Sequence, residues 1–255
     1  MERPLVTLDN SKAVVILGVL LAVGMSLAAL IFGIHAKQIG AARQTITVKG
    51  LAERPVSADA AEWTVGLRVQ GSSFADTLAK LRKERPALEA FLTTQGFAKD
   101  ALTDGNENVT PNMVEEDAPG GRTRTVQRGF NGAQNIVVRS KDLPRVIAAN
   151  KAILQLEAEG LPVSHEDPLF LVTTLEDVKM SLIGAATQNA QKRAEEFAKN
   201  GNVKVGAMRS ASQGSFYILP AGASEEATDY GGTYDKTTVD KLARVVVTID
   251  YNIER

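Results

Sequence analysis

The chain has 255 residues, a formal net charge of -1 and no cysteine. Its length suffices for one or two domains with a substantial core. The balanced charge gives no electrostatic reason to expect nucleic acid as a partner, and the lack of cysteine excludes disulfides, thiolate zinc sites and cysteine nucleophiles.

The first predicted element is a membrane-spanning helix. The run from Ala13 to Ile34 carries no charge and is long enough for a helix to cross about 30 Å of hydrocarbon. A cleavable signal peptide has an apolar region of only about 7 to 15 residues before small residues at its cleavage site. We therefore expect an uncleaved anchor, although basic residues on both sides leave its orientation open.

Small residues recur along this helix at a spacing that lets the backbones of two helices approach closely, although such residues are common in membrane helices generally. They are Gly18, Ala22, Ser26, Ala29 and Gly33. The spacing favours packing against a second membrane helix. We divide the chain into a short N-terminus (1–12), the span (13–34), a tether (35–44) and an α+β domain (45–255).

The stretch after the tether reads as strand, turn and strand. Gly50 follows a short apolar run, and Trp63 to Val69 alternates apolar and polar side chains with a period of two. The glycines match neither G-x-G-x-x-G nor a phosphate loop, which needs Gly-Lys-Ser/Thr at a helix start. We predict a Gly/Pro turn between Gly50 and Asp59, and no nucleotide site.

Three helices are predicted further along. Ser73 caps the first and Gly96 ends it, while the second runs from about 142 to 158 and the third from about 175 to 200. The third has an alanine-rich face that suits close packing on a sheet.

Strands are predicted between and after these helices. They lie near 107–113, 126–130 and 135–139, at 168–174, and over 203–218 and 242–253. The first two flank a Gly/Pro-rich hairpin tip, and the last alternates most regularly. We expect this last strand to be a sheet edge that pairs with a second subunit. The pattern is typical of an α+β fold with a largely antiparallel sheet and helices packed on one face.

Few residues are placed for chemistry. His35 and His165 are the two histidines, and Ser164, His165 and Asp167 are too close in sequence to form a catalytic relay. The acids cluster in two loops whose glycine and serine content favours solvent, with weak cation binding as the alternative. We expect no catalytic residue, no metal site and no cofactor.

A long loop over 219–238 precedes the last strand. Loops of this length are usually functional or disordered. Three tyrosines surround it, and tyrosine in a glycine-rich loop favours a self-association surface. They are Tyr217, Tyr230 and Tyr234.

Four stretches, in this order, carry a family resemblance. They are ITVKGLAERPVSADAAEWTVGLRV, NIVVRSKDLPRVIAANKAILQLEAEG, AATQNAQKRAEEFAKNGNVKVG and ARVVVTIDYNI. Over about 45–254 the chain resembles the SIMPL-domain family of bacterial envelope proteins. Gly50, Val56, Asp59 and Ala61 match the family's opening turn, whereas Ala58 stands where the family usually has proline.

The resemblance implies an envelope domain, exported or anchored, that assembles into large homo-oligomeric rings or channel-like cages with links to oxidative or envelope stress. It implies no established active site. We therefore expect a non-enzymatic, single-pass inner-membrane protein with a periplasmic C-terminal domain. Its expected partners are the bilayer, further copies of itself and other envelope proteins. The alternatives are a monomeric envelope adaptor, a small-molecule-binding module and an extracytoplasmic hydrolase.

Overall fold

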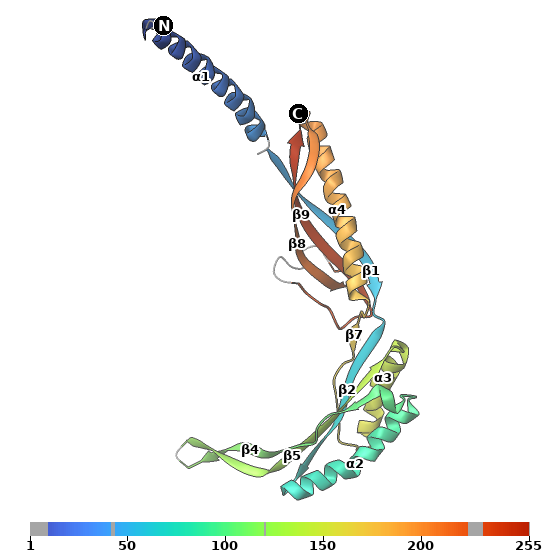
Figure 1. The fold of residues 1–255 in the computed structure, drawn as a ribbon. Coiled ribbons are helices and arrows are strands. Elements are labelled where there is room, and N and C mark those ends of the chain that lie inside the picture. Colours follow the sequence, from blue (N-terminus) through green and yellow to red (C-terminus); the bar gives the residue numbers. More distant parts are fainter. Residues whose placement is uncertain (1–9, 42–43, 120, 224–231, 255) are drawn as a thin grey trace, which may run out of the picture. The chain divides into compact units, whose positions relative to one another are not determined.

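The computed structural model describes residues 10–41, 44–119, 121–223 and 232–254, and it has an α+β fold with antiparallel sheets (Figure 1). The helices are α1 (Asn10–Ala41), α2 (Phe74–Thr94), η1 (Lys99–Ala101), α3 (Leu143–Ala158) and α4 (Leu175–Asn200). The strands are β1 (Thr45–Ser57), β2 (Ala60–Gly71), β3 (Leu102–Asp104), β4 (Asn108–Ala118), β5 (Arg122–Ser140), β6 (Val163–His165), β7 (Leu169–Leu171), β8 (Lys204–Pro220) and β9 (Asp240–Glu254).

The chain folds into two compact units. The first comprises Met1–Ala52, Ile183–Gly214 and Val246–Arg255, and the second comprises Glu53–Leu182 and Ser215–Val245. Neither unit is a continuous piece of chain, because β1, α4, β8 and β9 each contribute residues to both.

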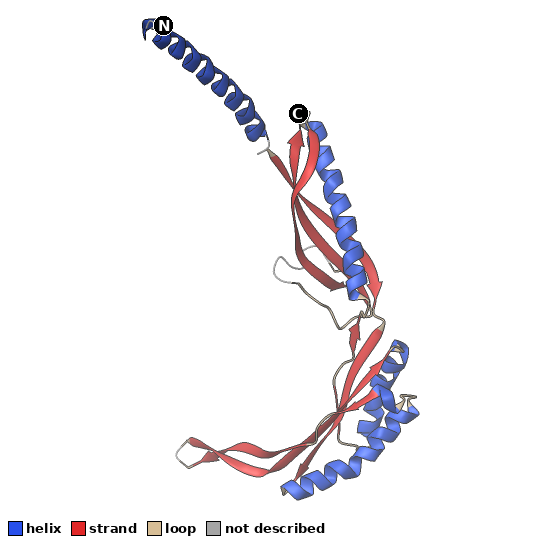
Figure 2. Cartoon of the chain, viewed as in Figure 1, coloured by secondary structure: helices blue, strands red, loops and turns tan. Residues whose placement is uncertain are grey.

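The first unit pairs a sheet with a helix of small side chains. Its strands follow the order β1-β9-β8, and α4 lies along one face of this sheet (Figure 2). Ala186, Ala190 and Ala194 on α4 are fully buried. A Cβ on Gly50 would lie 2.0 Å from the carbonyl oxygen of Ala186 and 2.8 Å from Ala190 Cβ. Only glycine therefore fits this contact, which confirms that the alanine-rich face packs on a sheet.

Two sequence predictions about this sheet are wrong. Gly50 lies inside β1 and does not begin the turn, which is confined to Ala58 and Asp59. The last strand, β9, is not an edge but the central strand, hydrogen-bonded to β1 on one side and β8 on the other. The edges of the sheet are therefore β1 and β8.

The second unit contains a six-stranded sheet with the path β3-β5-β2-β6, to which β4 and β7 are added. β2 and β5 pair antiparallel from Ala61↔Ser140 to Gly71↔Phe130. Helices α2 and α3 cover one face (Figure 2). The core centres on Trp63, which is fully buried and donates its indole N–H to the carbonyl oxygen of Glu166 at 3.0 Å.

The helix ends in this unit confirm the sequence predictions. The Ser73 hydroxyl accepts from the backbone N–H of Asp76, and the Asp142 carboxylate accepts from that of Arg145. Gly96 and Gly160 follow the helix ends with positive φ angles of 85° and 96°, where glycine is unstrained. Short polar caps and glycines thus set the bounds of α2 and α3 locally.

One long strand replaces two predicted strands. The segments 126–130 and 135–139 both belong to β5, which pairs with β4 to form an extended hairpin (Figure 1). The register of this hairpin shifts between Pro111 and Met113. Its outer part includes the predicted acidic loop, where Glu116 forms ion pairs with Arg124 and Arg128. The acidic stretch is therefore strand rather than loop.

Candidate functional site

The family-signature turn is a hydrogen-bonded junction between β1 and β2. Val56 is half-buried and Ala61 is buried in the core of the second unit. The Asp59 carboxylate accepts from the backbone N–H and the hydroxyl of Thr173, at 2.7 and 2.8 Å. Burial alone would raise the pKa of the Asp59 carboxyl, but these two hydrogen bonds outweigh it and lower the pKa. Asp59 thus has a structural role, tying the turn to the segment before α4.

Ala58 completes this junction through its backbone. Its N–H donates to the carbonyl oxygen of Val239 at 2.9 Å. A proline at this position has no N–H and could not make this bond. The departure from the family pattern at Ala58 therefore adds a hydrogen bond to the turn.

A buried ion pair closes the end of the long loop. The ammonium of Lys241, whose side chain is 0% exposed, lies 3.2 Å from Asp235 Oδ2 and donates to the carbonyl oxygen of Asp235 at 2.7 Å. Asp235 also accepts from the backbone N–H and hydroxyl groups of Thr237 and Thr238. Burial raises the pKa of the Asp235 carboxyl, but these donors together hold it far below its ordinary value. Sequence reasoning missed this pair, because its burial follows from tertiary packing.

The three tyrosines of the predicted self-association surface differ in position. Tyr217 on β8 is half-buried, and Tyr234 is half-buried with its hydroxyl oxygen accepting from the backbone N–H of Val172 at 2.9 Å. Ile218 and Tyr234 form a β-bridge, so Tyr217 and Tyr234 lie near each other. Tyr230 lies outside the described residues. Of the two described tyrosines, Tyr234 serves internal packing, and the surface role remains a prediction.

The Ser164, His165 and Asp167 cluster does not converge. Ser164 and His165 are consecutive in β6, where they pair with Gly66 and Val65, so their side chains point to opposite faces of the sheet. His165 Nδ1 is buried and has no hydrogen-bond partner among the described residues. Within that part of the chain no cluster of three or more acidic or histidine side chains could hold a metal ion.

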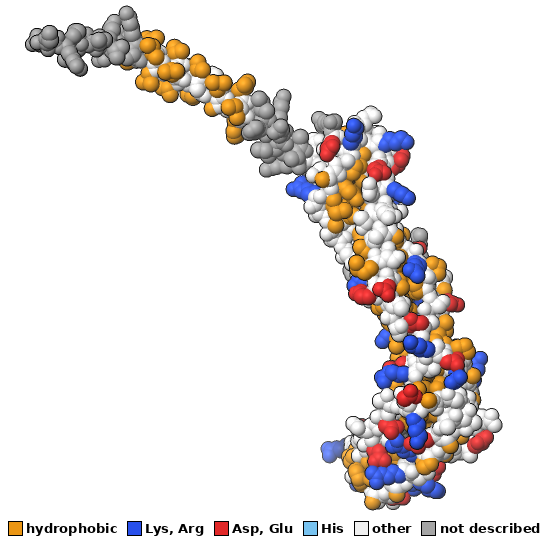
Figure 3. Space-filling model, turned by 45° about the vertical axis from the view of Figure 1, so that its right-hand side comes forward, with side chains coloured by type: hydrophobic (Ala, Val, Ile, Leu, Met, Phe, Trp, Pro, Cys, Tyr) orange, Lys and Arg blue, Asp and Glu red, His pale blue; other side chains and the backbone are white. Residues whose placement is uncertain are grey.

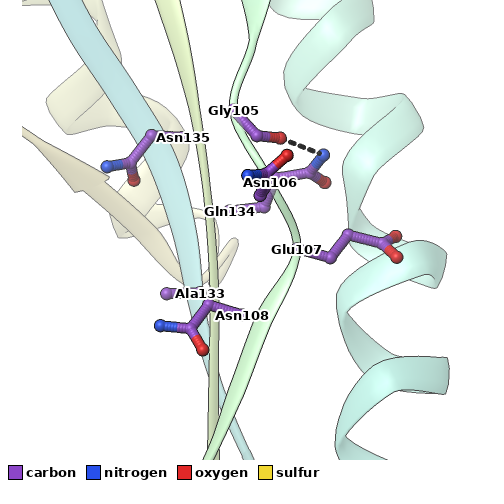
Figure 4. Close-up of a pocket in the computed structure, with 7 residues that line it drawn as sticks. All are labelled: Gly105, Asn106, Glu107, Asn108, Ala133, Gln134 and Asn135. Carbon is purple, nitrogen blue, oxygen red and sulfur yellow. Dashed lines mark hydrogen bonds between the residues drawn. The ribbon is translucent and has the colours of Figure 1, made fainter.

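A hollow of about 510 Å³ lies where β5 changes partner from β3 to β4. Gln134 donates its amide to the carbonyl oxygen of Gly105 at 3.1 Å, while Glu107 points toward α2 and Asn135 points to the other side of β5 (Figure 4). The carboxylate of Glu107 is paired with Arg82 at 2.8 Å. The polar groups around this hollow therefore diverge, and the geometry offers no acid and base aimed at one point.

The sequence model of the SIMPL family, described as a protein of unknown function (DUF541), matches residues 46–249. The chain belongs to the SIMPL family. A search of curated proteins finds no match. The SIMPL match begins within β1 and ends within β9, so it covers both sheets and leaves α1 outside.

Helix α1, outside the SIMPL match, is long and apolar enough over Val14–Phe32 to cross a membrane. Its large apolar side chains are 52–76% exposed, and Figure 3 shows apolar side chains along the face of the helix that is in view. Anchors and signal sequences share these properties. Gly18, Ala22, Ser26 and Ala29 lie on this continuous helix, and Ala22 and Ser26 line a shallow hollow on its surface. Gly33 is also helical, but its surroundings lie outside the described side chains.

Proposed function

We propose that this SIMPL protein is a single-pass inner-membrane protein whose C-terminal domain faces the periplasm and self-assembles into a large homo-oligomeric ring or channel-like cage. The proposal includes a role in envelope or oxidative stress and no enzymatic activity. The span of α1 and the family resemblance support the anchored topology. The observation that carries the proposal of self-assembly is the contrast between the two edges of the three-stranded sheet.

Helix α4 bonds to the outward edge of β1 at the middle of the strand. The carbonyl oxygen of Gln44 accepts from the N–H of Ile253, and the N–H of Ala58 donates to the carbonyl oxygen of Val239. The even-numbered residues at both ends of β1 therefore bond to the β9 side. Odd-numbered residues therefore face outward. The outward N–H of Leu51 donates to Asn189 Oδ1 and the outward carbonyl of Lys49 accepts from Arg193, both at 3.2 Å. Two side chains of α4 thus satisfy one N–H and one C=O on this edge of β1.

The outward edge of β8 lacks such cover over most of its length. At one end, Ile218 exchanges hydrogen bonds with Thr233 and Asp235. From Lys204 to Gly214, however, no described residue bonds to this edge, and residues 207–214 are all exposed. An uncovered edge of this length is a template for pairing with another strand. A second copy of the chain is the partner we propose, and a ring requires a further, different contact for closure.

We expect a charge on this edge to dissociate the assembly. Ala211→Lys combined with Ala207→Lys places two lysines on the uncovered part of β8, where they oppose strand pairing. The protein mass measured by light scattering of the detergent-extracted full-length chain should then fall from that of an oligomer to the 27.2 kDa of the protomer. Gln191→Lys, which adds a charge to an exposed position of α4, is the control and should leave the oligomer intact.

Other outcomes separate the alternatives. A protomer mass for the unmodified chain would favour the monomeric adaptor. An oligomer that survives both lysines but dissociates when Gly18, Ala22 and Ser26 are replaced by leucine would assign assembly to the anchor. We expect the leucine variant only to loosen the assembly, since lipid is as apolar as the helix and leaves packing as the main gain.

The topology has its own test. Protease added to intact spheroplasts should digest residues 45–255 and leave the anchor region protected, because the domain is proposed to lie outside the inner membrane. A cytoplasmic protein of known location is the control for intact membranes. Full protection of the domain would contradict the proposed orientation. The stress role predicts that cells lacking the protein grow less well than parental cells in peroxide.

A further inference from the structure

A second pocket, separate from the hollow at Gly105, lies entirely within the second unit. It has a volume of about 390 Å³ and lies between α3, the strand β7 with the residues before it, and the segment that leads into β9. This volume lies within the range of about 300–1,000 Å³ that small-molecule sites occupy. The self-assembly proposed above does not use this pocket.

The walls of the pocket are apolar. Phe170 is 7% exposed, and the half-buried side chains of Ile147 and Val239 pack against the hydrophobic core of the unit. The backbone at Phe170 is held in place, because its N–H donates to the carbonyl oxygen of Lys236 at 2.7 Å. An apolar group that entered the pocket would therefore meet apolar side chains that pack against the core.

Asn150, one helical turn after Ile147, also lines the pocket. Its Oδ1 is buried and has no hydrogen-bond partner among the described residues, and its burial closes it to a ligand in the pocket. The polar contacts open to a ligand are therefore those of the exposed residues that line the pocket.

Two opposite charges also line the pocket. The exposed residues Lys151 and Asp167 provide an ammonium and a carboxylate. A ligand with a single charge would be attracted by one of them and repelled by the other, whereas a zwitterion satisfies both. The charges thus favour a small molecule that carries an ammonium and a carboxylate next to an apolar group.

We propose that this pocket binds a free apolar α-amino acid. Its side chain lies against Ile147, Phe170 and Val239. Its ammonium pairs with Asp167, and its carboxylate pairs with Lys151. The proposal concerns binding alone and includes no chemical step.

The test compares three probes that share one apolar chain. L-norleucine carries both charged groups, pentylamine lacks the carboxylate and hexanoate lacks the ammonium. In calorimetric titrations of the detergent-extracted full-length chain, norleucine should saturate one site per chain, and each partial probe should bind at least about fivefold more weakly. Equal affinity for norleucine and hexanoate, or no saturation by norleucine up to about 10 mM, would overturn the proposal.

Variants then assign the polar contacts. Asp167→Asn removes the carboxylate and should weaken norleucine about tenfold without weakening hexanoate, since hexanoate has no ammonium to pair with it. Lys151→Met should reduce the affinity for norleucine to that for pentylamine. Gln155→Leu, at an exposed position of the helix that carries Lys151, is the control. Asp167→Glu keeps the charge and should bind norleucine nearly as well as the unmodified chain, which preserves the test if Asp167→Asn fails to fold. Equal weakening of norleucine and hexanoate by Asp167→Asn would show a change of pocket shape only and contradict the assignment.

Discussion

Asp235→Ala is expected to destabilise the second unit by about 3–5 kcal/mol, because it leaves the ammonium of Lys241 buried without its carboxylate. The change also removes the acceptor for the N–H and hydroxyl groups of Thr237 and Thr238. Urea denaturation of the full-length chain, followed by the fluorescence of Trp63, measures the loss. Trp63 is suitable because it is the one tryptophan of the sequence and lies in the core of this unit.

An exposed ion pair provides the control. Glu176, whose side chain is 77% exposed, lies 3.7 Å from Lys179, and Glu176→Gln should change the stability by less than about 1 kcal/mol. Similar losses in Asp235→Ala and Glu176→Gln would mean that Lys241 is solvated in solution.

The same carboxylate makes stability depend on pH. The pKa of Asp235 is lower in the folded protein than in the unfolded chain. Its contribution is therefore fully present above the unfolded pKa of about 4 and is lost as the pH falls toward the folded value. The difference in unfolding free energy between the unmodified chain and Asp235→Ala should shrink below about pH 4. A difference that stays constant with falling pH would contradict this assignment.

Gly50→Val is expected to destabilise the first unit by about 3 kcal/mol or more, since overpacking of a closed contact forces the backbone to move. A Cβ at Gly50 would meet the carbonyl oxygen of Ala186, which is a backbone atom and cannot rotate away. Circular dichroism during urea denaturation should show helical signal lost at a lower urea concentration than in the unmodified chain.

Gly184→Ala, on the helix α4 that packs against Gly50, is the matched control. A Cβ there has no neighbour within 4 Å, and alanine favours helix over glycine by up to about 1 kcal/mol. This variant should be neutral or more stable. If Gly50→Val melts at the urea concentration of the unmodified chain, α4 does not pack on β1 as closely as described.

Local signals predicted the helices well. Ser73, Asp142, Gly96 and Gly160 are caps and stops whose effect depends on the few residues around them. The bounds of α2, α3 and α4 therefore follow from the sequence. The alanine face of α4 also predicted its packing, because a neighbour that lies close to a helix leaves room only for small side chains.

Strand order could not be predicted in the same way. β9 alternates buried and half-buried residues, a pattern that is as typical of an edge strand as of a central strand with one covered face. Its place between β1 and β8 depends on pairings with residues far away in the sequence. Gly50 was misplaced for a related reason, because its function is to admit α4, which follows more than a hundred residues later.

The pocket was missed because it gathers residues from separate segments, and the ion pair was missed because the burial of Asp235 and Lys241 follows from tertiary packing. Asn150, Asp167 and Val239 belong to different elements, and no spacing in the sequence links them. The histidines and acid loops drew attention in the sequence because of their chemistry. In the structure Ser164 and His165 point to opposite faces of β6.

The central place of β9 has a consequence for the order in which the protein folds. A chain delivered from its N-terminus exposes β1 first and β8 much later, yet neither can find its neighbour before β9 emerges. Until then both strands hold unpaired backbone groups, and the β8 edge is open to other chains on both sides. Residues 240–254 are thus the last strand to be synthesised and the one that completes the sheet. Before they emerge, the nascent protein most needs protection from aggregation.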